Sequence, residues 1–387
     1  MFGCSACSNR FDRLLNDYTY FSRIIVSIIH KVLFRGDDAV WPKVSIIWVN
    51  YNSVAKLPIV LESLESIAEL DYPFERYELI VVDNGSTDGS YEEISKFLEK
   101  KNNLHKKIIR LQKNLGFTGG NNVGFRARDK GSKYVLLLNN DAVLFQEGLK
   151  KLVEIFENLG KVAGVQGVVL KYKSGLIDTA GGYINEFLQP YLLGQGYPYK
   201  WKTKKYLPVT YLDGSCALYR VKNILECVGN KLFLDEFFAY YDDTLLGLMM
   251  WNCSYKLIAV PEPIAYHVRN LTFRREKGFL LSYLTMRNRI ALTFISNTRY
   301  KDIILLHALR SSIVSLLRGR DKGLQKARIR ALYDGIKLGK RMRKRGIFLD
   351  IYKAPLIKMS LKDVGVVFTQ GTKKYTENLK KTFASTV

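Results

Sequence analysis

The chain has 387 residues, 47% of them hydrophobic, which is enough for a sizeable core in one large domain with appendages or in two domains. Its net charge of +24 is concentrated in residues 268–387, which hold 28 Lys and Arg but only 7 Asp and Glu, so this region requires an anionic partner. Five cysteines, an odd count, argue against a disulfide framework, and Cys216, Cys227 and Cys253 are expected to be buried thiols in a reducing compartment.

Residues 1–43 are expected to form an N-terminal extension that ends near Pro42. The extension contains a lone C-x-x-C pair, Cys4 and Cys7, without a second pair at zinc-site spacing. Its apolar run at 24–29 is too short for a signal peptide and is not followed by a cleavage site of small residues. The run is compatible with an amphipathic helix that packs on the protein or on a membrane.

From residue 44 onward, apolar runs typical of buried strands alternate with segments that repeat apolar residues at helical spacing. Strands or extended segments are expected at 44–49, 77–82, 107–111, 133–138, 162–170, 209–219 and 255–260. Helices are expected at 55–70, 91–100, 120–129, 146–158 and 243–252. This alternation predicts a mostly parallel sheet covered by helices on both faces. Residues 171–208, rich in Gly and Tyr, are expected to be a loop or hairpin insertion that binds a second substrate.

Three clusters of acidic and amide side chains each follow an apolar, strand-like run. They are DNGSTD (83–88), NND (139–141) and DD (242–243). Open α/β sheets hold their ligands at the carboxyl ends of parallel strands. The three clusters therefore predict one crevice that holds an anionic, metal-bound ligand and a catalytic base.

Each cluster allows a second interpretation. The Asp83 carboxylate either accepts hydrogen bonds from a ligand edge or caps the following helix as an Asx-turn. Asp141 is the natural ligand for Mg²⁺ or Mn²⁺, and His267 is either a further metal ligand or a structural histidine. Asp242 and Asp243 either tune one another as a general base or are N-terminal acids that interact with a helix dipole.

A glycine-rich segment, NLGFTGGNNVG (114–124), allows backbone N–H groups to approach an anionic ligand at a helix N-terminus. It has neither the G-x-G-x-x-G spacing of a dinucleotide site nor the Gly-Lys-Ser/Thr ending of a P-loop. The pattern predicts a ligand-facing helix that begins near Gly120 and runs to Asp129.

The basic last third contains an amphipathic segment, 279–318, in which arginines interrupt the apolar residues. No stretch there reaches the roughly 20 uninterrupted apolar residues needed to span a bilayer. We therefore expect a basic helix in the interface of an anionic membrane, with 340–345 binding phosphates or lipid head groups. The alternative is a helix that packs on the core and exposes a solvated basic face.

Residues 44–260 resemble the catalytic domain of inverting glycosyltransferase family 2, which has the GT-A fold. The resemblance is carried by VSIIWVNYNS (44–53), VVDNGSTDGS (81–90), NLGFTGGNNVG (114–124), LLLNNDAV (136–143), YLDGSCALYR (211–220) and FFAYYDDTLLGL (237–248). These segments are most similar to the rhamnosyltransferase and galactofuranosyltransferase branch. The resemblance implies a Rossmann-like α/β catalytic domain, which we place at 44–275. The basic tail is not diagnostic of the family, and its charge and amphipathic segment predict a basic, mainly helical, membrane-associating region at 276–387.

The resemblance also implies a role for each motif residue. The nucleotide-sugar site is expected to contain Asn52, Asp83, Gly119, Gly120, Asn121 and Asn140. Asp141 and His267 are expected to bind a divalent cation, Mg²⁺ or Mn²⁺, and Asp242 to act as the general base, with Asp243 beside it as the alternative. Two features depart from the family pattern. Asn139 and Asn140 leave one carboxylate in the D-x-D motif, and Leu245 replaces a second acid.

The implied function is inverting transfer of a hexosyl or deoxyhexosyl group from a nucleoside-diphosphate sugar to a hydroxyl of a lipid-linked or cell-surface glycan. The enzyme is expected to be peripheral at the cytoplasmic face of the cell membrane, with the anionic membrane surface rather than nucleic acid as its partner. The alternative is a non-catalytic nucleotide-binding scaffold with a membrane- or nucleic-acid-binding tail, because fold alone does not establish function.

Overall fold

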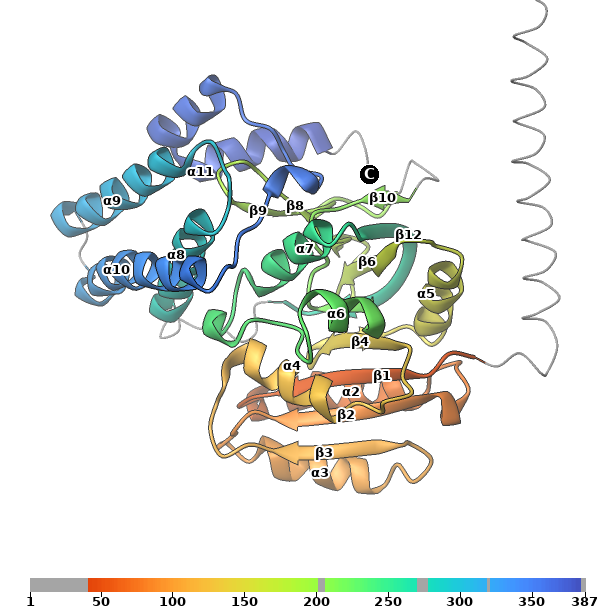
Figure 1. Cartoon of the computed structure of the whole chain (residues 1–387). Helices are drawn as coiled ribbons and strands as arrows, with labels where there is room; N and C mark the ends of the chain where they lie inside the picture. The colour runs from red at the N-terminus through yellow and green to blue at the C-terminus, as the bar shows by residue number, and fades with distance from the viewer. Residues whose placement is uncertain (1–40, 201–205, 270–277, 319–320, 384–387) are drawn as a thin grey trace, which may run out of the picture. The chain divides into compact units, whose positions relative to one another are not determined.

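A twisted β-sheet lies at the centre of the computed structural model, with a group of helices beside it (Figure 1). The structure describes residues 41–200, 206–269, 278–318 and 321–383. The expected N-terminal helix at 24–29 and the Cys4–Cys7 pair lie outside the described residues. Within the described ranges, no helix is both long enough and apolar enough to traverse a bilayer.

The strands begin at the first predicted apolar run and follow its pattern. They are β1 (Val44–Asn50), β2 (Tyr77–Asp83), β3 (Lys106–Arg110), β4 (Tyr134–Asn139), β5 (Ala142–Leu144), β6 (Val162–Lys171), β7 (Ile177–Thr179), β8 (Gly182–Ile184), β9 (Pro190–Leu192), β10 (Leu207–Pro208), β11 (Cys216–Arg220) and β12 (Lys256–His267). β12 is longer than expected, because it continues through register shifts around Pro263 as far as His267. This extension matters for the site, since it carries a histidine into the sheet.

The described helices include five that lie close to the predicted ranges 55–70, 91–100, 120–129, 146–158 and 243–252, and others that those ranges do not contain. They are α2 (Leu57–Ala68), α3 (Ser90–Glu99), α4 (Gly116–Ala127), α5 (Gly148–Glu157), α6 (Val221–Cys227), α7 (Asp242–Asn252), α8 (Gly278–Phe294), α9 (Lys301–Arg318), α10 (Lys322–Lys344) and α11 (Leu361–Phe383). Short 3₁₀ turns lie at Val54–Lys56, Phe74–Arg76, Asp235–Phe237 and Ile351–Lys353. The helix expected to begin near Gly120 begins earlier, at Gly116.

Ten of the described strands form one sheet in the order β10-β12-β6-β11-β4-β1-β2-β3, with β5 paired to β12 and β7 to β6. β1, β2, β3 and β4 run parallel, as do β6 and β12, whereas β11 is antiparallel to both of its neighbours. The expected insertion at 171–208 contributes short strands, including the separate β8–β9 hairpin. The predicted α/β sheet architecture is thus confirmed.

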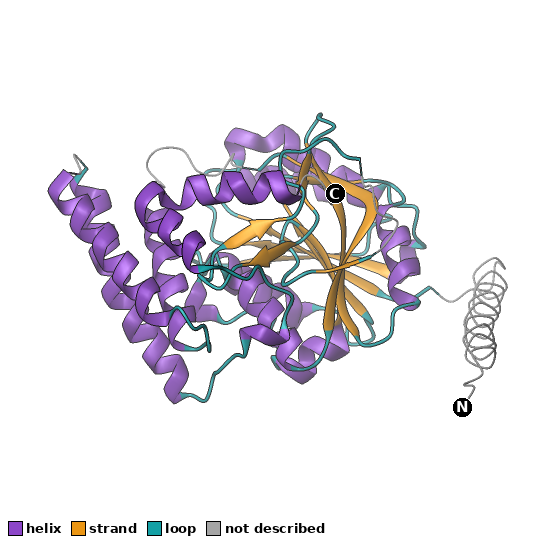
Figure 2. Ribbon diagram, turned by 90° about the horizontal axis from the view of Figure 1, so that it is seen from above, coloured by secondary structure: helices purple, strands orange, loops and turns teal. Residues whose placement is uncertain are grey.

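Helices cover both faces of the sheet because alternate side chains of β1 point to opposite sides. Trp48 faces α2, where its indole nitrogen donates to the hydroxyl of Ser63 at 3.0 Å. Val49 faces α4, which can approach closely because a Cβ at Gly120 would lie 2.8 Å from the Val49 side chain. Figure 2 shows the sheet edge-on between its helices.

The basic last third is helical, as predicted, and its apolar side chains pack in a second buried cluster that it shares with α7 and with residues 184–188. Leu245 and Leu248 of α7 lie in the same buried cluster as Leu292 of α8 and Leu338 of α10. α7 also contributes Leu246 to the cluster that covers the sheet, so this one helix belongs to both cores. Lys43–Val387 form one compact unit, and the expected domain boundary at residue 276 stays a prediction.

The cysteines require a correction. Cys227 at the end of α6 and Cys253 just after α7 form a disulfide, although both were expected to be free thiols. No local pattern in the sequence indicates this pairing, because the two helix ends meet only in the folded chain. Cys216 is a buried free thiol, as expected, and burial raises its pKa.

Candidate active site

The register of the sheet brings the predicted polar clusters to one edge. Asn50 at the end of β1 lies opposite Asp83 at the end of β2, and Val49 lies opposite Asn139 at the end of β4. At the far side of the site, His267 at the end of β12 lies opposite the first residue of β5. Because β5 directly follows Asp141, this pairing places the histidine beside that carboxylate.

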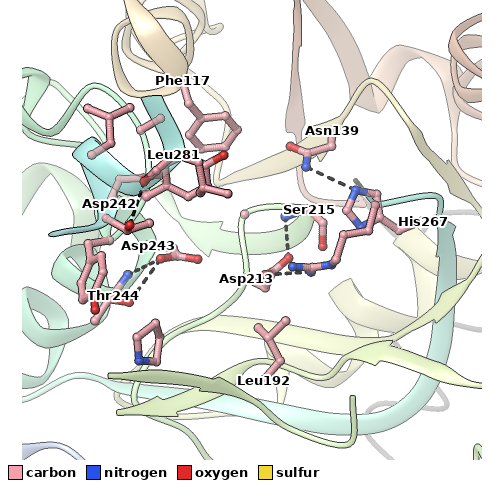
Figure 3. Close-up of a pocket in the computed structure, with 18 of the residues that line it drawn as sticks. Phe117, Asn139, Leu192, Asp213, Ser215, Asp242, Asp243, Thr244, His267 and Leu281 are labelled. Carbon is pink, nitrogen blue, oxygen red and sulfur yellow. Dashed lines mark hydrogen bonds and ion pairs between the residues drawn. The ribbon is translucent and has the colours of Figure 1, made fainter. Parts of the chain in front are cut away.

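A cavity of about 810 Å³ opens at this edge. Five of the predicted site residues line it: Asn140, Asp141, Asp242, Asp243 and His267. Figure 3 shows Asp242 and Asp243 on one side, Asn139 and His267 on the other, and Asp213 between them. Two acidic clusters that lie 100 residues apart in the sequence therefore share one cavity.

On the side of the cavity that contains Asp141, acidic and basic side chains alternate in a buried hydrogen-bonded network. His267 lies between two carboxylates, with Nε2 at 2.9 Å from Asp141 Oδ1 and Nδ1 at 2.9 Å from Asp178 Oδ2. Arg269 donates from Nε to Asp178 at 2.7 Å and from Nη2 to Asp213 at 3.0 Å. Asp178 is thus shared by the imidazole and the guanidinium, and it fixes the orientation of the His267 ring.

Hydrogen bonds set the ionisation states of His267 and Asp141 in this network. Burial alone would lower the pKa of His267, but the hydrogen bonds with Asp141 and Asp178 raise it to about 9. Burial would raise the pKa of Asp141, but the bond to His267 holds it below its usual value. At neutral pH the pair is therefore an imidazolium and a carboxylate. A cation that bound His267 Nε2 would have to displace a proton.

Asp141 and His267 fit a divalent cation as a two-residue site. One carboxylate oxygen and one imidazole nitrogen already face each other, and this donor set suits Mn²⁺ or Mg²⁺ when phosphate oxygens complete the shell. The Asn139 amide lies 3.5 Å from His267 Nε2. Among the described residues, no group of three or more His, Cys, Asp or Glu side chains is arranged around a common point. The protein alone would hold a cation weakly, and a diphosphate would strengthen the site.

Asp242 and Asp243 begin α7, and the preceding loop is unusual. Phe238, Tyr240 and Tyr241 all have positive φ angles, which non-glycine residues adopt only when the surroundings hold them. The Asn288 amide supplies this support from α8, donating to the carbonyls of Phe237, Ala239 and Tyr240 at 2.7 to 3.0 Å. The C-terminal region thereby shapes the turn that presents the two carboxylates.

The two carboxylates ionise at unusually high pH. Burial, and then the charge of Asp213, raise the pKa of Asp242 to about 7. Burial, followed by the charges of Asp242 and Asp213, raises the pKa of Asp243 well above its ordinary value. The backbone N–H of Thr244 donates to Asp243 at 2.6 Å. Near neutral pH, Asp242 is about half-ionised, which is the property of an effective general base.

The raised pKa of Asp242 predicts a pH dependence of stability. A carboxyl whose pKa rises from 3.8 to about 7 on folding stabilises the fold fully below pH 3.8 and loses this contribution as the pH rises toward about 7. In chelator, the melting temperature of Asp242→Asn should therefore fall less across this interval than that of the parent chain. Thermal unfolding at a series of pH values measures the difference. Parallel curves for the two proteins would contradict the raised pKa.

The predicted nucleotide-pocket residues lie behind the cavity wall. Asp83 is buried, with Oδ1 accepting from the Asn50 amide at 2.9 Å and Oδ2 from the backbone of Ser86 at 3.0 Å. Asn50 in turn accepts from the cavity-lining Asn140 at 3.2 Å. Asn52 has a φ of 45° and accepts from the backbone of Thr87. Asp83 and Asn52 thus stabilise the loops at this end of the cavity through hydrogen bonds. Their direct contact with a ligand stays a prediction.

The glycine-rich segment is also placed differently from the expectation. Gly119, Gly120 and Asn121 are buried within α4 and do not line the cavity. Gly116 lines it instead, at the first residue of α4, where its φ of 77° and its closeness to the Phe238 carbonyl exclude a side chain. Gly119 and Gly120 pack closely against neighbouring side chains and Gly116 shapes the cavity, while the expected contact of residues 119–121 with the nucleotide sugar stays a prediction.

Several cavity residues were not predicted from the sequence. Asn84, Asn114 and Phe117 lie within segments that were predicted to face the ligand, although they were not singled out, and Asp213 lies within the YLDGSCALYR motif. Arg269 follows His267 by two residues and had no signal of its own. Asp178, which orients His267, lies in the insertion and had no local signal.

A sheet whose carboxyl ends carry a carboxylate–imidazole pair, facing two buried carboxylates across a cavity, has the form of a catalytic α/β domain. Residues 45–227 match the sequence model described as Glycosyl transferase family 2. This match covers slightly less than half of the chain. The narrower rhamnosyl and galactofuranosyl branch stays a prediction.

Individual relatives are distant. Poly(ribitol-phosphate) β-N-acetylglucosaminyltransferase TarS of Staphylococcus aureus is 30% identical over 132 residues, which are 32% of this chain and 22% of TarS. Dolichyl-phosphate β-glucosyltransferase of Dictyostelium discoideum is 25% identical over 139 residues, 35% of this chain and 41% of that protein. The chain thus spans less than half the length of either relative.

The fold has a solved counterpart. The crystal structure of GalNAc-T7, which holds UDP, GalNAc and Mn²⁺, is similar to this chain with a TM-score of 0.55 at 14% identity. The similarity covers 81% of this chain and 59% of GalNAc-T7. It shows that the two proteins share the GT-A fold.

Proposed function

We propose that this protein is an inverting glycosyltransferase that moves a sugar from a nucleoside-diphosphate sugar to a hydroxyl acceptor. The observation that carries the proposal is the shared cavity, in which Asp141 and His267 face Asp242 and Asp243. The first pair suits a cation-bound diphosphate, and the second suits proton removal. The match of residues 45–227 to the family 2 sequence model supports the same reaction.

In this mechanism, each side chain has a distinct task. Asp242 accepts the proton of the acceptor hydroxyl, whose oxygen forms a bond to C1 of the sugar as the bond from C1 to the diphosphate oxygen breaks. Asp141 and His267 would hold Mn²⁺ or Mg²⁺, which neutralises charge on the leaving diphosphate when bound. Asp178 keeps the His267 ring in place. Attack from the face opposite the leaving group inverts the configuration at C1.

The donor is proposed to carry a hexosyl or deoxyhexosyl group. The names of TarS and of the Dictyostelium enzyme describe N-acetylglucosaminyl and glucosyl transfer, and GalNAc-T7 was crystallised with UDP. The rhamnosyl or galactofuranosyl alternative comes from the sequence motifs. A comparison of the corresponding donors therefore decides the sugar.

The acceptor is proposed to be a glycan that is lipid-linked or at the cell surface. Beyond Asp242, the cavity wall becomes apolar, with Leu280, Leu281 and Leu284 from α8, and Leu379 from α11. This wall favours an acceptor with an apolar portion near its reacting hydroxyl.

Donor binding can be tested by thermal shift with UDP-, dTDP- and GDP-sugars, each with and without Mn²⁺. A ligand at about 100 times its Kd stabilises the fold by about 2.7 kcal/mol, which is a readily measured shift. We expect one nucleotide to raise the melting temperature, and Mn²⁺ to increase that rise. No shift with any nucleotide sugar, in either condition, would contradict the proposed donor class.

A further inference from the structure

Lys56 is a basic side chain on the wall of the cavity to which the proposed mechanism gives no task. It is half-buried, and it lines the cavity together with Asp141. It is the last residue of the 3₁₀ turn Val54–Lys56, which leads directly into α2. A half-buried ammonium group at a proposed diphosphate site is suited to bind phosphate oxygens.

The sheet places this lysine near the NND motif. β1 and β4 are neighbouring parallel strands, with Val49 opposite Asn139, so the segments that follow them leave the same edge of the sheet side by side. Lys56 follows β1, and Asp141 follows β4. Burial would raise the pKa of Asp141, but the hydrogen bond with His267 and the charges of His267 and Lys56 lower it. The ammonium group and this carboxylate therefore lie near each other on one side of the cavity.

Hydrogen bonds hold the turn that carries this lysine. The Asn50 amide oxygen accepts from the Ser53 hydroxyl at 2.5 Å and from the Asn140 amide at 3.2 Å, so one side chain connects the turn to the NND motif. The backbone N–H of Val54, within the turn, donates to Asp88 at 2.8 Å. The backbone of the turn is thus in place before a ligand arrives, which lowers the entropic cost of binding.

Helix stability does not explain a lysine at this position. Lys56 is the N-cap residue of α2. Ser, Thr, Asp and Asn are favoured at an N-cap because their side chains accept hydrogen bonds from the first turn. A lysine ammonium group has no acceptor atom, and its charge opposes the helix dipole. A residue that breaks a local rule in this way is expected at a functional site.

The buried network on the Asp141 side of the cavity does not attract a diphosphate by itself. It joins three carboxylates to two cations, so it carries one net negative charge. These groups are Asp141, Asp178, Asp213, His267 and Arg269. A diphosphate is also anionic and requires positive charge from other groups. Lys56 adds such a charge to that of a divalent cation.

We propose that Lys56 binds the diphosphate of the donor, beside the cation site at Asp141 and His267. This inference rests on the proposed function, because it assigns a further residue to the donor site. The ammonium group donates charge-assisted hydrogen bonds to phosphate oxygens, so part of the donor binding persists without a metal ion. As the bond to C1 breaks, the same charge stabilises the leaving diphosphate.

Calorimetric titration tests this contact without a transfer assay. UDP, dTDP and GDP are titrated into the parent chain and into Lys56→Met, in EDTA and in Mn²⁺, and the matching nucleosides serve as ligands without phosphate. In EDTA, Lys56→Met should weaken diphosphate binding by about tenfold to 100-fold, the usual effect of losing a hydrogen bond to a charged group. The loss should be smaller in Mn²⁺, because the metal ion supplies charge at the same place. Nucleoside binding should not change.

Matched variants separate the charge from the side chain. Lys56→Arg keeps the charge and should bind the diphosphate nearly as well as the parent chain. Lys56→Gln removes the charge in a second way and should repeat the loss seen with Lys56→Met. Lys222→Met makes the same chemical change at an exposed position of α6 that does not line the cavity, and it should behave as the parent chain. Melting temperatures without ligand show that each variant is folded.

The outcomes distinguish this contact from the proposed function. Equal diphosphate affinity of the parent chain and of both uncharged variants in EDTA would overturn the contact and leave the proposed function standing. Equal losses for nucleoside and diphosphate, or binding by the parent chain only in Mn²⁺, would overturn it as well. If the parent chain bound none of the three diphosphates in either condition, the donor class itself would fail, and this inference would fail with it.

Discussion

Replacing Asp242 by Asn should abolish sugar transfer while leaving donor binding nearly unchanged. The amide keeps the shape of the side chain but cannot accept the proton of the acceptor hydroxyl, and loss of a general base typically costs on the order of 10²–10⁴ in rate. The cation-side residues Asp141 and His267 are untouched, so the nucleotide-induced shift in melting temperature should persist. Initial rates of transfer and thermal shifts on the same preparation measure the two effects.

Asp243→Asn provides the comparison within the pair. The charge of Asp242 helps to raise the pKa of Asp243, so removing that charge would lower the pKa of Asp243. If Asp242→Asn retained transfer, with the acidic limb of its pH profile moved to lower pH, the proton acceptor would be Asp243. That outcome would contradict the assignment of Asp242, and Asp243→Asn would then show the larger loss.

Asp141→Asn should remove the part of donor binding that depends on Mn²⁺. Asp141 is the one carboxylate of the NND motif, and its oxygen faces the imidazole nitrogen that would share the cation. Without it, we expect transfer to fall by on the order of 100-fold or more, because the cation contributes several kcal/mol of charge stabilisation. Thermal shift with the preferred nucleotide sugar, in Mn²⁺ and in chelator, isolates this contribution.

The control for this variant is Asp71→Asn. Asp71 is an exposed carboxylate that pairs with Lys150 on the surface and does not line the cavity. It undergoes the same chemical change, and an exposed ion pair contributes only about 0–1 kcal/mol. Its response to Mn²⁺ should match that of the parent chain. An Asp141→Asn variant that keeps a full response to Mn²⁺ would mean that the cation binds elsewhere.

The sequence predicted those site residues that stand at strand ends or helix starts. Asp141 follows β4, which the apolar run before it predicts, and the carboxyl ends of parallel strands meet at one edge of the sheet. The run before Asp242 is also predicted to be strand-like, but the structure has a 3₁₀ turn and a loop with positive φ angles there, so Asp242 reaches the cavity as the first residue of α7. Local patterns also predicted the sheet, from its alternating apolar runs, and the basic helical region, from its charge and amphipathic spacing.

Residues that depend on distant partners could not be predicted. Asp178 contacts His267 across 89 positions of sequence, and no periodicity reports such a pairing. The Cys227–Cys253 disulfide likewise depends on how α6 and α7 are packed. The glycines could not be assigned for a different reason. A glycine that packs against another element, as Gly120 does against Val49, looks the same in the sequence as a glycine that faces a ligand.

Helix α7 both carries the two carboxylates and packs against the C-terminal helices, so the protein cannot be divided between these parts without exposing α7. Its first turn carries the two carboxylates, and its flank, with Leu245 and Leu248, is sealed by α8 and α10. A fragment that ended before Gly278 would expose this flank of α7 to water. It would also lose the Asn288 amide, which donates hydrogen bonds to the loop before Asp242. Residues 45–227, which match the family model, therefore lack contacts that shape the cavity, and the C-terminal helices form part of the candidate site.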